Sequence, residues 1–464
     1  MTRFVDDPRD RRLRAALVAS VGGFLFGFDW VVIAGAKPFY ESSFEIQQSP
    51  LIQGSLMAAA LAGCLIGSLV AGAVSDRCGR KPLLMASAIG FLCSAVGTAL
   101  ASGVIAFAIF RWIGGLAIGV TASTSPLYIA EVSRQEHRGR MVSVHQLMIV
   151  IGILAAQIAN WFFASYADTT RAFLPNAALD HDDCWRAMFA MEALPAALFL
   201  WWLRGVPESI AANTENGVAA SRAASSGPVV VDGGASNDGG VLQTTRNQRP
   251  GDDEAPGGEP SATAGPGSLG LLMVGVSLAV FQQWCGVNVL FSYAENVFSA
   301  AGYELDAVMW SMVCTGIINL VFTLLAMLIV DRVGRRPLLV VGAIGLAATF
   351  VGLGMAYRNV THPTWVLAAV MAAIALYAMT LAPVTWIVIS EIFPGPRRGW
   401  RMGLCVASLW SANALLTFFY PSLEASFGIG KMFFAFAALC AFAGGLMLLA
   451  LPETRANRLA TGDP

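Results

Sequence analysis

The sequence has little charge. Only 13% of its 464 residues are charged, whereas 56% are hydrophobic and the mean hydropathy is +0.63. These values are far from the balance of a soluble globular domain. The net formal charge is −1, so no basic excess points to a nucleic-acid partner. The composition therefore indicates an integral membrane protein, surrounded by lipid.

Patterns that would suggest covalent or metal chemistry are also missing. The eight cysteines are scattered, mostly within apolar runs, at no spacing typical of metal ligands, so we expect neither disulfides nor a zinc site. No nucleophile, base and orienting group recur as a set, which argues against an enzyme. We expect no cofactor and no metal.

Long apolar runs are abundant. A bilayer core of about 30 Å needs roughly 20 apolar residues per helix. We predict an all-α membrane protein with twelve spans, near residues 15–36, 51–74, 82–101, 104–129, 141–166, 188–203, 270–292, 307–330, 337–357, 364–390, 400–422 and 429–451. The first run reaches full spanning length and carries an acid, so it is interpreted as a span and not as a cleavable signal peptide.

Basic residues are distributed unevenly between the connections. Most Lys and Arg residues flank the spans on one side, in clusters at 9–14, 77–81, 134–140, 332–336 and 397–401. The opposite side has only Lys37, Arg171, Arg186, Arg358 and Lys431. Cytoplasmic connections carry the excess of basic residues. Both termini are therefore predicted to be cytoplasmic.

The chain is predicted to contain two similar halves. The stretch from Asp76 (DRCGRKP) recurs from Asp331 (DRVGRRP), and Glu131 of IAEVSRQEHRG recurs as Glu391 of ISEIFPGPRRG. Two echoes at nearly one separation indicate a duplicated six-helix unit, and such repeats place a substrate site near the bilayer midplane. We predict bundles at 1–204 and 267–464, joined by a flexible cytoplasmic linker at 205–266 that is rich in Gly, Ser, Ala, Pro and Asp.

One carboxylate lies in the middle of the first span. Asp29 sits in FLFGFDWVVIAGA, and two other charges, Arg111 and Glu192, lie within spans of the same half. An ionisable residue at membrane depth is a functional hypothesis by default. With all three groups ionised, the cluster has an excess negative charge whose burial is costly, so we expect it to bind one proton. The alternative is a permanent Asp29–Arg111 ion pair that only orients the helices.

The seventh span contains an unusual number of amides. Gln282, Gln283 and Asn288 lie in FQQWCGVNVLFSY, and the spacing of six residues predicts a helix break at Gly286. Broken helices form binding sites in transporters. The alternative role for a single amide in a span is to hydrogen bond neighbouring helices. His145, beside Gln146, is interpreted as a packing residue, not a proton relay.

These motifs together resemble the sugar porter family of the major facilitator superfamily. The resemblance rests on two D-R-x-G-R-[KR] loops, two E-x6-R loops, PES at 207–209, QQ-x4-N at 282–288 and PET at 452–454. The pattern is closest to that of the family's bacterial proton-coupled symporters. It implies a twelve-helix fold in two pseudo-symmetric halves that binds a monosaccharide, a pentose or a hexose.

The resemblance also implies roles for individual residues. Proton-coupled members have an acid at the position of Asp29 and an arginine at that of Arg111, whereas mammalian facilitators lack the acid. Glu192 ends a matching W-R-x-M-F-x-x-E pattern. The implied sugar site adds Phe26, Gln146, Asn319, Trp386 as a stacking ring, and Asn413, with Tyr293 and Trp410 lining or gating the cavity. The family often has an amide just before the Trp410 position, where this chain has Leu409.

Charged residues at the predicted cytoplasmic rim form a third set. The resemblance implies inter-helix ion pairs that close the cytoplasmic side while the site faces outward; they involve Asp76, Arg80, Glu131, Arg138, Asp331, Arg335, Glu391 and Arg398. Arg–carboxylate bonds are strong and often bidentate. The alternative is that these charges only set topology, in partly solvated pairs that contribute about 0 to 1 kcal/mol each.

The sequence thus predicts a proton-coupled monosaccharide importer of a bacterial-type inner membrane, acting as a monomer by alternating access, with a sugar and a proton as its partners. The nearest alternative is an uncoupled facilitator of the same fold. A more distant one is a membrane sugar sensor, which we disfavour because such sensors tend to carry long cytoplasmic extensions.

Overall fold

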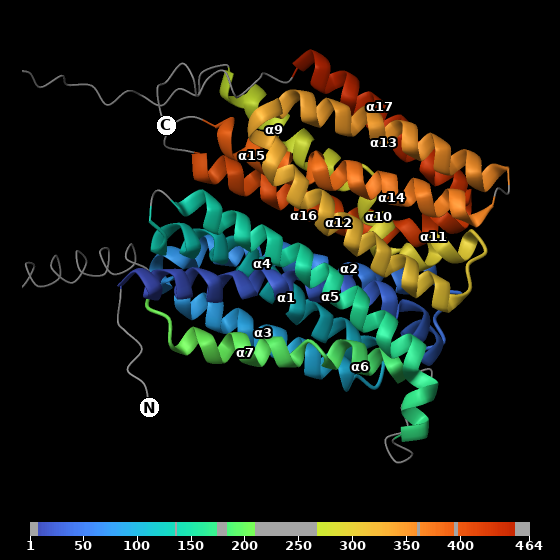
Figure 1. The fold of residues 1–464 in the computed structure, drawn as a ribbon, viewed down its shortest axis with the longest axis horizontal. Coiled ribbons are helices and arrows are strands. Elements are labelled where there is room, and N and C mark those ends of the chain that lie inside the picture. The colour runs from blue at the N-terminus through green and yellow to red at the C-terminus, as the bar shows by residue number, and fades with distance from the viewer. Residues whose placement is uncertain are drawn as a thin grey trace, which may run out of the picture.

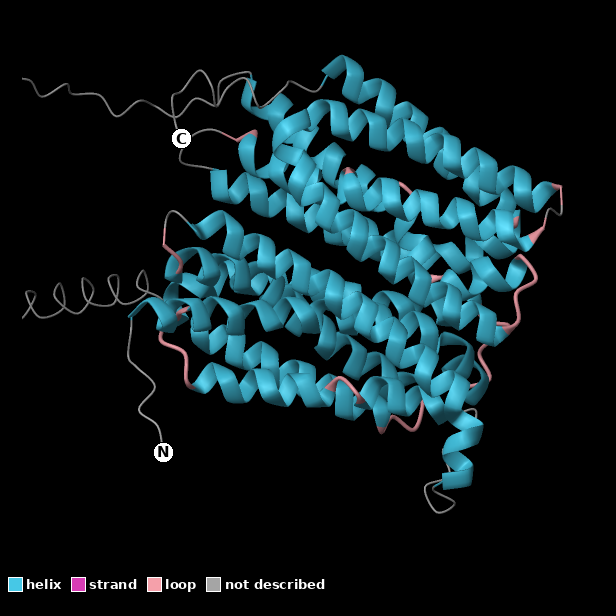
Figure 2. Cartoon of the chain, in the orientation of Figure 1, coloured by secondary structure: helices cyan, strands magenta, loops and turns pink. Residues whose placement is uncertain are grey.

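The computed structural model describes residues 8–134, 137–173, 183–208, 267–359, 362–393 and 398–450. Within these ranges the ordered elements are helices, and none is a strand (Figure 2). Twelve helical segments are long and apolar enough to cross a membrane, which confirms the predicted number of spans. Most of the predicted linker, 209–266, and the PET motif lie outside the described residues.

The helices follow one another along the chain. Their bounds are α1 (Pro8–Ser43), α2 (Pro50–Cys78), α3 (Arg80–Ala99), α4 (Val104–Val132), α5 (Arg138–Phe173), α6 (Cys184–Ala190), α7 (Ala193–Arg204), α9 (Gly267–Trp284), α10 (Val287–Ser292), α11 (Ala294–Ala300), α12 (Leu305–Val333), α13 (Arg335–Arg358), α14 (Pro363–Met379), α15 (Leu381–Glu391), α16 (Arg398–Phe427) and α17 (Ile429–Ala450).

The first and sixth spans show two differences from the prediction. The first continues through Pro38 to Ser43, because neighbouring helices can stabilise a proline kink within a membrane. The sixth begins at Cys184 and is interrupted at Met191 and Glu192, so it consists of α6 and α7. Glu192 therefore sits at a break in its span.

The helices form two groups that lie one above the other in Figure 1. We call α1–α7 the N-half and α9–α17 the C-half. In the N-half, α1 packs against α4 and α5, and α2 packs against α4; in the C-half, α13 packs against α17. The halves touch mainly through α2 with α16 and through α5 with α12. Both bundles thus meet along an extended interface.

Small residues allow close packing inside the N-half. A Cβ on Gly115 of α4 would lie 1.9 Å from the Ala60 carbonyl oxygen of α2, and one on Gly119 would lie 2.2 Å from that of Cys64. The same holds for α1 and α5, where a Cβ on Gly27 would lie 1.9 Å from the Ile149 carbonyl oxygen. These helices approach backbone to backbone, which fixes the position of α1 and of Asp29 on it.

The two ends of the helical bundle are called the outer end and the inner end. The outer end carries the α1–α2 connection at residues 44–49, and the inner end carries the α2–α3 connection at Gly79. The outer end is at the right in Figure 1 and the inner end at the left.

Candidate functional site

Asp29, Arg111 and Glu192 come together in the core of the N-half, as the sequence led us to expect. Arg111 of α4 forms an ion pair through Nη1 with Asp29 Oδ1 of α1. Its Nη2 also donates to the Asp29 backbone oxygen at 2.9 Å. The guanidinium lies 5.3 Å from the centre of the Phe189 ring. All three charged side chains are buried, with at most 1% of each exposed.

The cluster contains two carboxyl groups but only one guanidinium, so its charges do not cancel when all three are ionised. Asp29 Oδ2 and both carboxylate oxygens of Glu192 are buried without a hydrogen-bond partner among the described residues. Glu192 is nevertheless a direct neighbour of the Asp29 carboxyl. Ionised carboxylates only accept hydrogen bonds, so these two can bond to each other only when one holds a proton. The geometry can therefore accommodate one proton between two carboxyls and one guanidinium.

A glycine makes room for the cluster. A Cβ on Gly114 of α4 would lie 2.6 Å from Asp29 Oδ2 and 2.4 Å from the Ser94 hydroxyl of α3. That hydroxyl is also buried, and no described residue forms a hydrogen bond with it. The space beside the free carboxylate oxygen is thus polar and kept clear of side chains on α4.

The amides of the seventh span form a continuous row. The span breaks at Gly286, whose φ of 94° is left-handed, which confirms the predicted break. Asn288 Nδ2 donates to Gln283 Oε1 at 2.5 Å and to the Gln283 backbone oxygen at 3.0 Å. Gln283 Nε2 donates to Gln282 Oε1 at 2.5 Å. The break turns the two glutamines and the asparagine toward one another.

The row continues to a residue that sequence reasoning missed. Gln282 Nε2 donates to the hydroxyl of Tyr377 in α14 at 2.9 Å. Nothing in the local sequence distinguishes Tyr377 from an aromatic packing residue, because the contact depends on how two separate spans meet.

The other predicted sugar-site residues lie on several helices. Asn413 of α16 is buried and accepts from Thr417 Oγ1 at 3.4 Å. Asn319 of α12 is buried, Gln146 of α5 is half-buried, and Trp386 of α15 is 40% exposed. Within the described residues, none of the four hydrogen bonds to the amide row. The structure thus places these four side chains on α5, α12, α15 and α16 and, among the described residues, does not join them to the amide row.

Aromatic rings link the halves next to the charged cluster. Phe26 of α1 lies 5.9 Å from Trp410 of α16, and Trp30 of α1 lies 5.9 Å from Phe291 of α10, measured between ring centres. Phe26 and Trp30 flank Asp29 on α1. Tyr293, the other predicted gating residue, donates to the Thr417 backbone oxygen at 2.5 Å. The helix that holds the acid also touches the opposite half.

The predicted inner-end pairs are present where their side chains are described. Arg80 lies 3.1 Å from Glu131, joining α3 to α4, and Arg335 lies 3.5 Å from Glu391, joining α13 to α15. Each pair stays within one half. The side chains of Asp76, Arg138, Asp331 and Arg398 are outside the described residues.

Glu208 of the PES motif has a clear structural role. Its Oε1 accepts from the backbone nitrogens of Arg80 at 2.9 Å and Lys81 at 3.1 Å. A carboxylate at this position stabilises the start of α3. The sequence of the motif alone does not indicate which helix it contacts.

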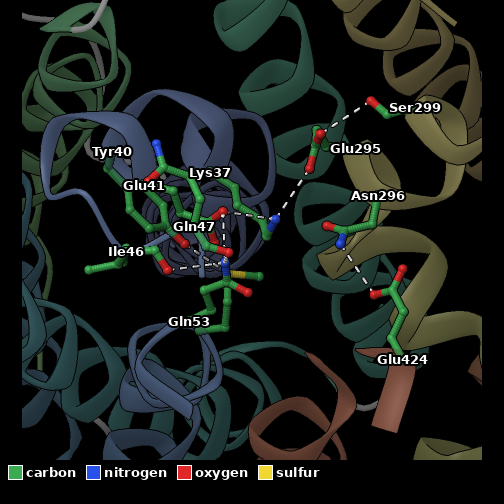
Figure 3. A network of polar contacts seen from close by, with 11 residues as sticks. Lys37, Tyr40, Glu41, Ile46, Gln47, Gln53, Glu295, Asn296, Ser299 and Glu424 are labelled. Atoms are coloured by element: carbon green, nitrogen blue, oxygen red, sulfur yellow. Dashed lines mark hydrogen bonds and ion pairs between the residues drawn. The ribbon is translucent and has the colours of Figure 1, made fainter. Parts of the chain in front are cut away.

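Polar contacts join the halves at the outer end (Figure 3). Lys37 of α1 pairs with Glu41 of the same helix and with Glu295 of α11, both at 3.2 Å. Nearby, Asn296 donates to Glu424 at 3.2 Å. A cavity of about 490 Å³ lies here between the two halves and is lined by Lys37, Pro38, Glu41, Gln47, Pro50, Gln53, Glu295, Asn296, Pro421, Glu424 and Ala425.

A second set of contacts runs along α5 and α12. Gln157 donates to Thr315 at 3.1 Å, and Ser165 donates to Asp306 at 2.6 Å. Between them, the rings of Trp161 and Trp310 lie 5.2 Å apart. Together with Lys37–Glu295, these contacts join the halves on the outer side of the molecule.

The chain matches known proteins over almost its full length. The family model for sugar (and other) transporters matches residues 15–462. The chain is 32% identical to the D-xylose-proton symporter of Escherichia coli (strain K12), covering 96% of this chain and 93% of that protein. It is also 32% identical to the glucose facilitated diffusion protein of Zymomonas mobilis, covering 96% and 95%.

A solved structure shares the fold. A crystal structure of a D-xylose-proton symporter matches with a TM-score of 0.77 and 31% identity, covering 96% of this chain and 99% of that one. This likeness, with the twelve spans, confirms the predicted all-α membrane fold class.

Proposed function

Because the chain belongs to the sugar (and other) transporter family, we propose that it imports a monosaccharide together with a proton by alternating access. The resemblance noted in the sequence is confirmed by the family match, and the relatives described above are transport proteins, not enzymes. A proton-coupled sugar symporter is among them.

The observation that carries the proposal is the unbalanced buried cluster of Asp29, Arg111 and Glu192. A purely structural ion pair would need one carboxylate for one guanidinium. Here a second, fully buried carboxylate without a hydrogen-bond partner lies beside the first. Burying an excess charge is costly unless it is neutralised, so the arrangement supports uptake of one proton. The second carboxylate therefore favours a proton-coupling role for Asp29 and Arg111 over a permanent ion pair that only orients the helices.

Helix α1 can link protonation of Asp29 to a change in the contact between the two halves. In the cycle we propose, a proton on Asp29 breaks its ion pair with Arg111 and loosens α1 from α4. Phe26 and Trp30 on the same helix contact the C-half, so a shift of α1 alters the contact between the halves. Release of the proton on the opposite side restores the pair. Two states of one helix would then couple protonation to opening.

Sugar would bind at the interface of the halves, near the amide row. Amides both donate and accept hydrogen bonds, as a ring of hydroxyls requires, and the partly exposed Trp386 offers an apolar face for stacking. We assign Phe26, Gln146, Gln282, Gln283, Asn288, Asn319, Trp386 and Asn413 to this site, with Tyr293 and Trp410 as gating residues.

The remaining assignments follow from the same mechanism. We propose that the protein acts as a monomer in a bacterial-type plasma membrane, with the inner end and both termini facing the cytoplasm. The eight charged residues named above for the inner end would stabilise that end when it is closed. The bundles 1–204 and 267–464 would rock about their interface while 205–266 connects them.

An uncoupled facilitator is the second candidate. The observation that favours it is the equal identity, 32%, to a glucose facilitated diffusion protein. The two functions differ in whether sugar entry carries protons.

The test is transport by the purified protein in proteoliposomes. A panel of pentoses and hexoses is offered with and without an inward proton gradient. We expect one or more sugars to accumulate only with the gradient, and sugar entry to alkalinise a weakly buffered medium. Sugar that equilibrates without accumulation or pH change under both conditions would establish the facilitator instead, and no uptake of any sugar would refute both.

A further inference from the structure

The amide row has a fixed direction because one end is tied to the backbone. Asn288 Nδ2 donates to the carbonyl oxygen of Gln283, which can only accept, and its other N–H meets Gln283 Oε1. Gln283 must then direct its Nε2 to Gln282 Oε1, and Gln282 must direct its Nε2 to the Tyr377 hydroxyl. The hydroxyl is the last acceptor of the row.

A hydroxyl that accepts still has a proton to donate. In the row, Gln283 and Gln282 each use one N–H donor and their side-chain oxygen, whereas Tyr377 only accepts, so each of the three side chains retains one donor. Within the described residues no hydrogen bond uses the Tyr377 O–H as a donor. The row therefore ends in a free O–H donor on a half-buried side chain.

The contact between Gln282 and Tyr377 joins two broken spans. Gln282 lies two residues before Trp284, where α9 ends, and Tyr377 lies two residues before Met379, where α14 ends. The second break is at Thr380, whose φ and ψ of −123° and −81° are not helical. Transporters often form their substrate sites at interrupted spans, so the position of Tyr377 suits contact with the substrate.

Tyr377 places a hydroxyl donor on α14, whereas the residue just before Trp410 on α16 is apolar. That residue, Leu409, is only 1% exposed. It can offer no hydrogen bond to a sugar hydroxyl. Tyr377 offers one from a different helix.

We propose that Tyr377 is a specificity-determining residue of the sugar site, which holds the Gln282 amide in place and donates its own O–H to one oxygen of the bound monosaccharide. The inference rests on the proposed function, because it requires a sugar at this site. It predicts that recognition of one particular sugar hydroxyl depends on Tyr377 and not on Leu409.

The test pairs a change in the protein with a change in the sugar. Tyr377→Phe removes only the hydroxyl. Tyr357→Phe is the matched control, because Tyr357 is a C-half tyrosine whose hydroxyl donates to the Val297 backbone oxygen at 2.5 Å, at the outer end. Each variant and the wild type are assayed in proteoliposomes with D-xylose, D-glucose and the five single-deoxy analogues of D-glucose.

The expected result is a selective loss. A neutral hydrogen bond contributes roughly a 3- to 10-fold change in affinity, so Tyr377→Phe should raise the half-saturating concentration of the transported sugar by that factor and leave the maximal rate nearly unchanged. The penalty should disappear for one deoxy analogue, which already lacks the partner hydroxyl. Tyr357→Phe should penalise all sugars equally or not at all.

Two results separate failure of the inference from failure of the proposed function, and a second variant covers loss of folding. If Tyr377→Phe behaves like Tyr357→Phe for every analogue while the wild type transports sugar, the inference is wrong and the proposed function stands. If the wild type neither transports nor binds any of these sugars, the proposed function fails and the inference fails with it. Should Tyr377→Phe not fold, Tyr377→Met serves in its place, because it also removes the hydroxyl and should lose its penalty for the same deoxy analogue; an unselective loss would refute the inference.

Discussion

Replacing Asp29 with Asn is the most informative perturbation of the charged cluster. It keeps the size and polarity of the side chain but removes its charge and its ability to carry a proton. Asp29 and Arg111 are both buried, and breaking a buried pair on one side costs about 3 to 5 kcal/mol when no replacement is available. Here Glu192 is a neighbour of Asp29 and can pair with Arg111, so we expect the protein to remain folded.

The expected functional effect can be estimated. One proton moving with each sugar across 100 mV supplies about 2.3 kcal/mol. Because about 1.4 kcal/mol corresponds to a tenfold concentration ratio, this energy supports a roughly 50-fold ratio of internal to external sugar. The wild type should approach this ratio in energised proteoliposomes, whereas Asp29→Asn should reach a ratio of about one. Exchange of labelled for unlabelled sugar should persist in the variant, because exchange needs no net proton movement.

The control is Asp306→Asn. Asp306 accepts from Ser165 at 2.6 Å at the outer end and belongs to no buried cluster of carboxyls, so this variant should still accumulate sugar. The reasoning is refuted if Asp29→Asn concentrates sugar as the wild type does. It is also refuted if both aspartate variants lose accumulation equally.

Three further perturbations probe the opposite ends and the packing. Lys37→Met removes the ion pair that joins α1 to Glu295, so the outer end should open more often, about 5-fold for each kcal/mol lost; labelling of Ala425→Cys, which lines the outer cavity, should rise, and unchanged labelling would contradict the role of Lys37. Glu391→Gln weakens the inner-end pair with Arg335 and should increase the fraction of molecules open at the inner end, so labelling of the same cysteine should fall; unchanged labelling or a rise would argue against closure of the inner end by these pairs. Gly115→Val places a side chain where the Ala60 carbonyl lies 1.9 Å from the nearest possible Cβ, and should destabilise the N-half by about 1 to 3 kcal/mol; Gly72→Val, where no atom lies within 4 Å, is the control in thermal unfolding, and equal loss in both would show that close packing of α2 and α4 is not the cause.

Composition and local pattern were sufficient for much of the fold. Runs of apolar residues predict the number of spans because each span must cross the same thickness of lipid. The break at Gly286 was predictable because amides six residues apart cannot share one face of an intact helix. The position of Asp29 marked the charged cluster because an acid in an apolar span needs a nearby partner.

Other features depend on how distant segments meet. The bound of α1 beyond Pro38 could not be read from the sequence, because tertiary contacts decide whether a helix continues past a proline. The break at Glu192 could have been predicted from Pro195, which has no N–H to donate to the Met191 carbonyl oxygen four residues before it. The contacts of Tyr377 with Gln282 and of Lys37 with Glu295 each join spans far apart in the chain. Neither Tyr377 nor Lys37 belongs to a local motif.

Infrared difference spectroscopy of the carboxyl groups tests the central claim most directly. If Asp29 binds and releases the coupling proton, the wild type in lipid should show a protonated-carboxyl band that appears as the medium is acidified and changes when sugar is added. That band should be absent from Asp29→Asn and present in Asp306→Asn. A spectrum in which the band is missing from the wild type at every pH, or is unchanged in Asp29→Asn, would contradict the account.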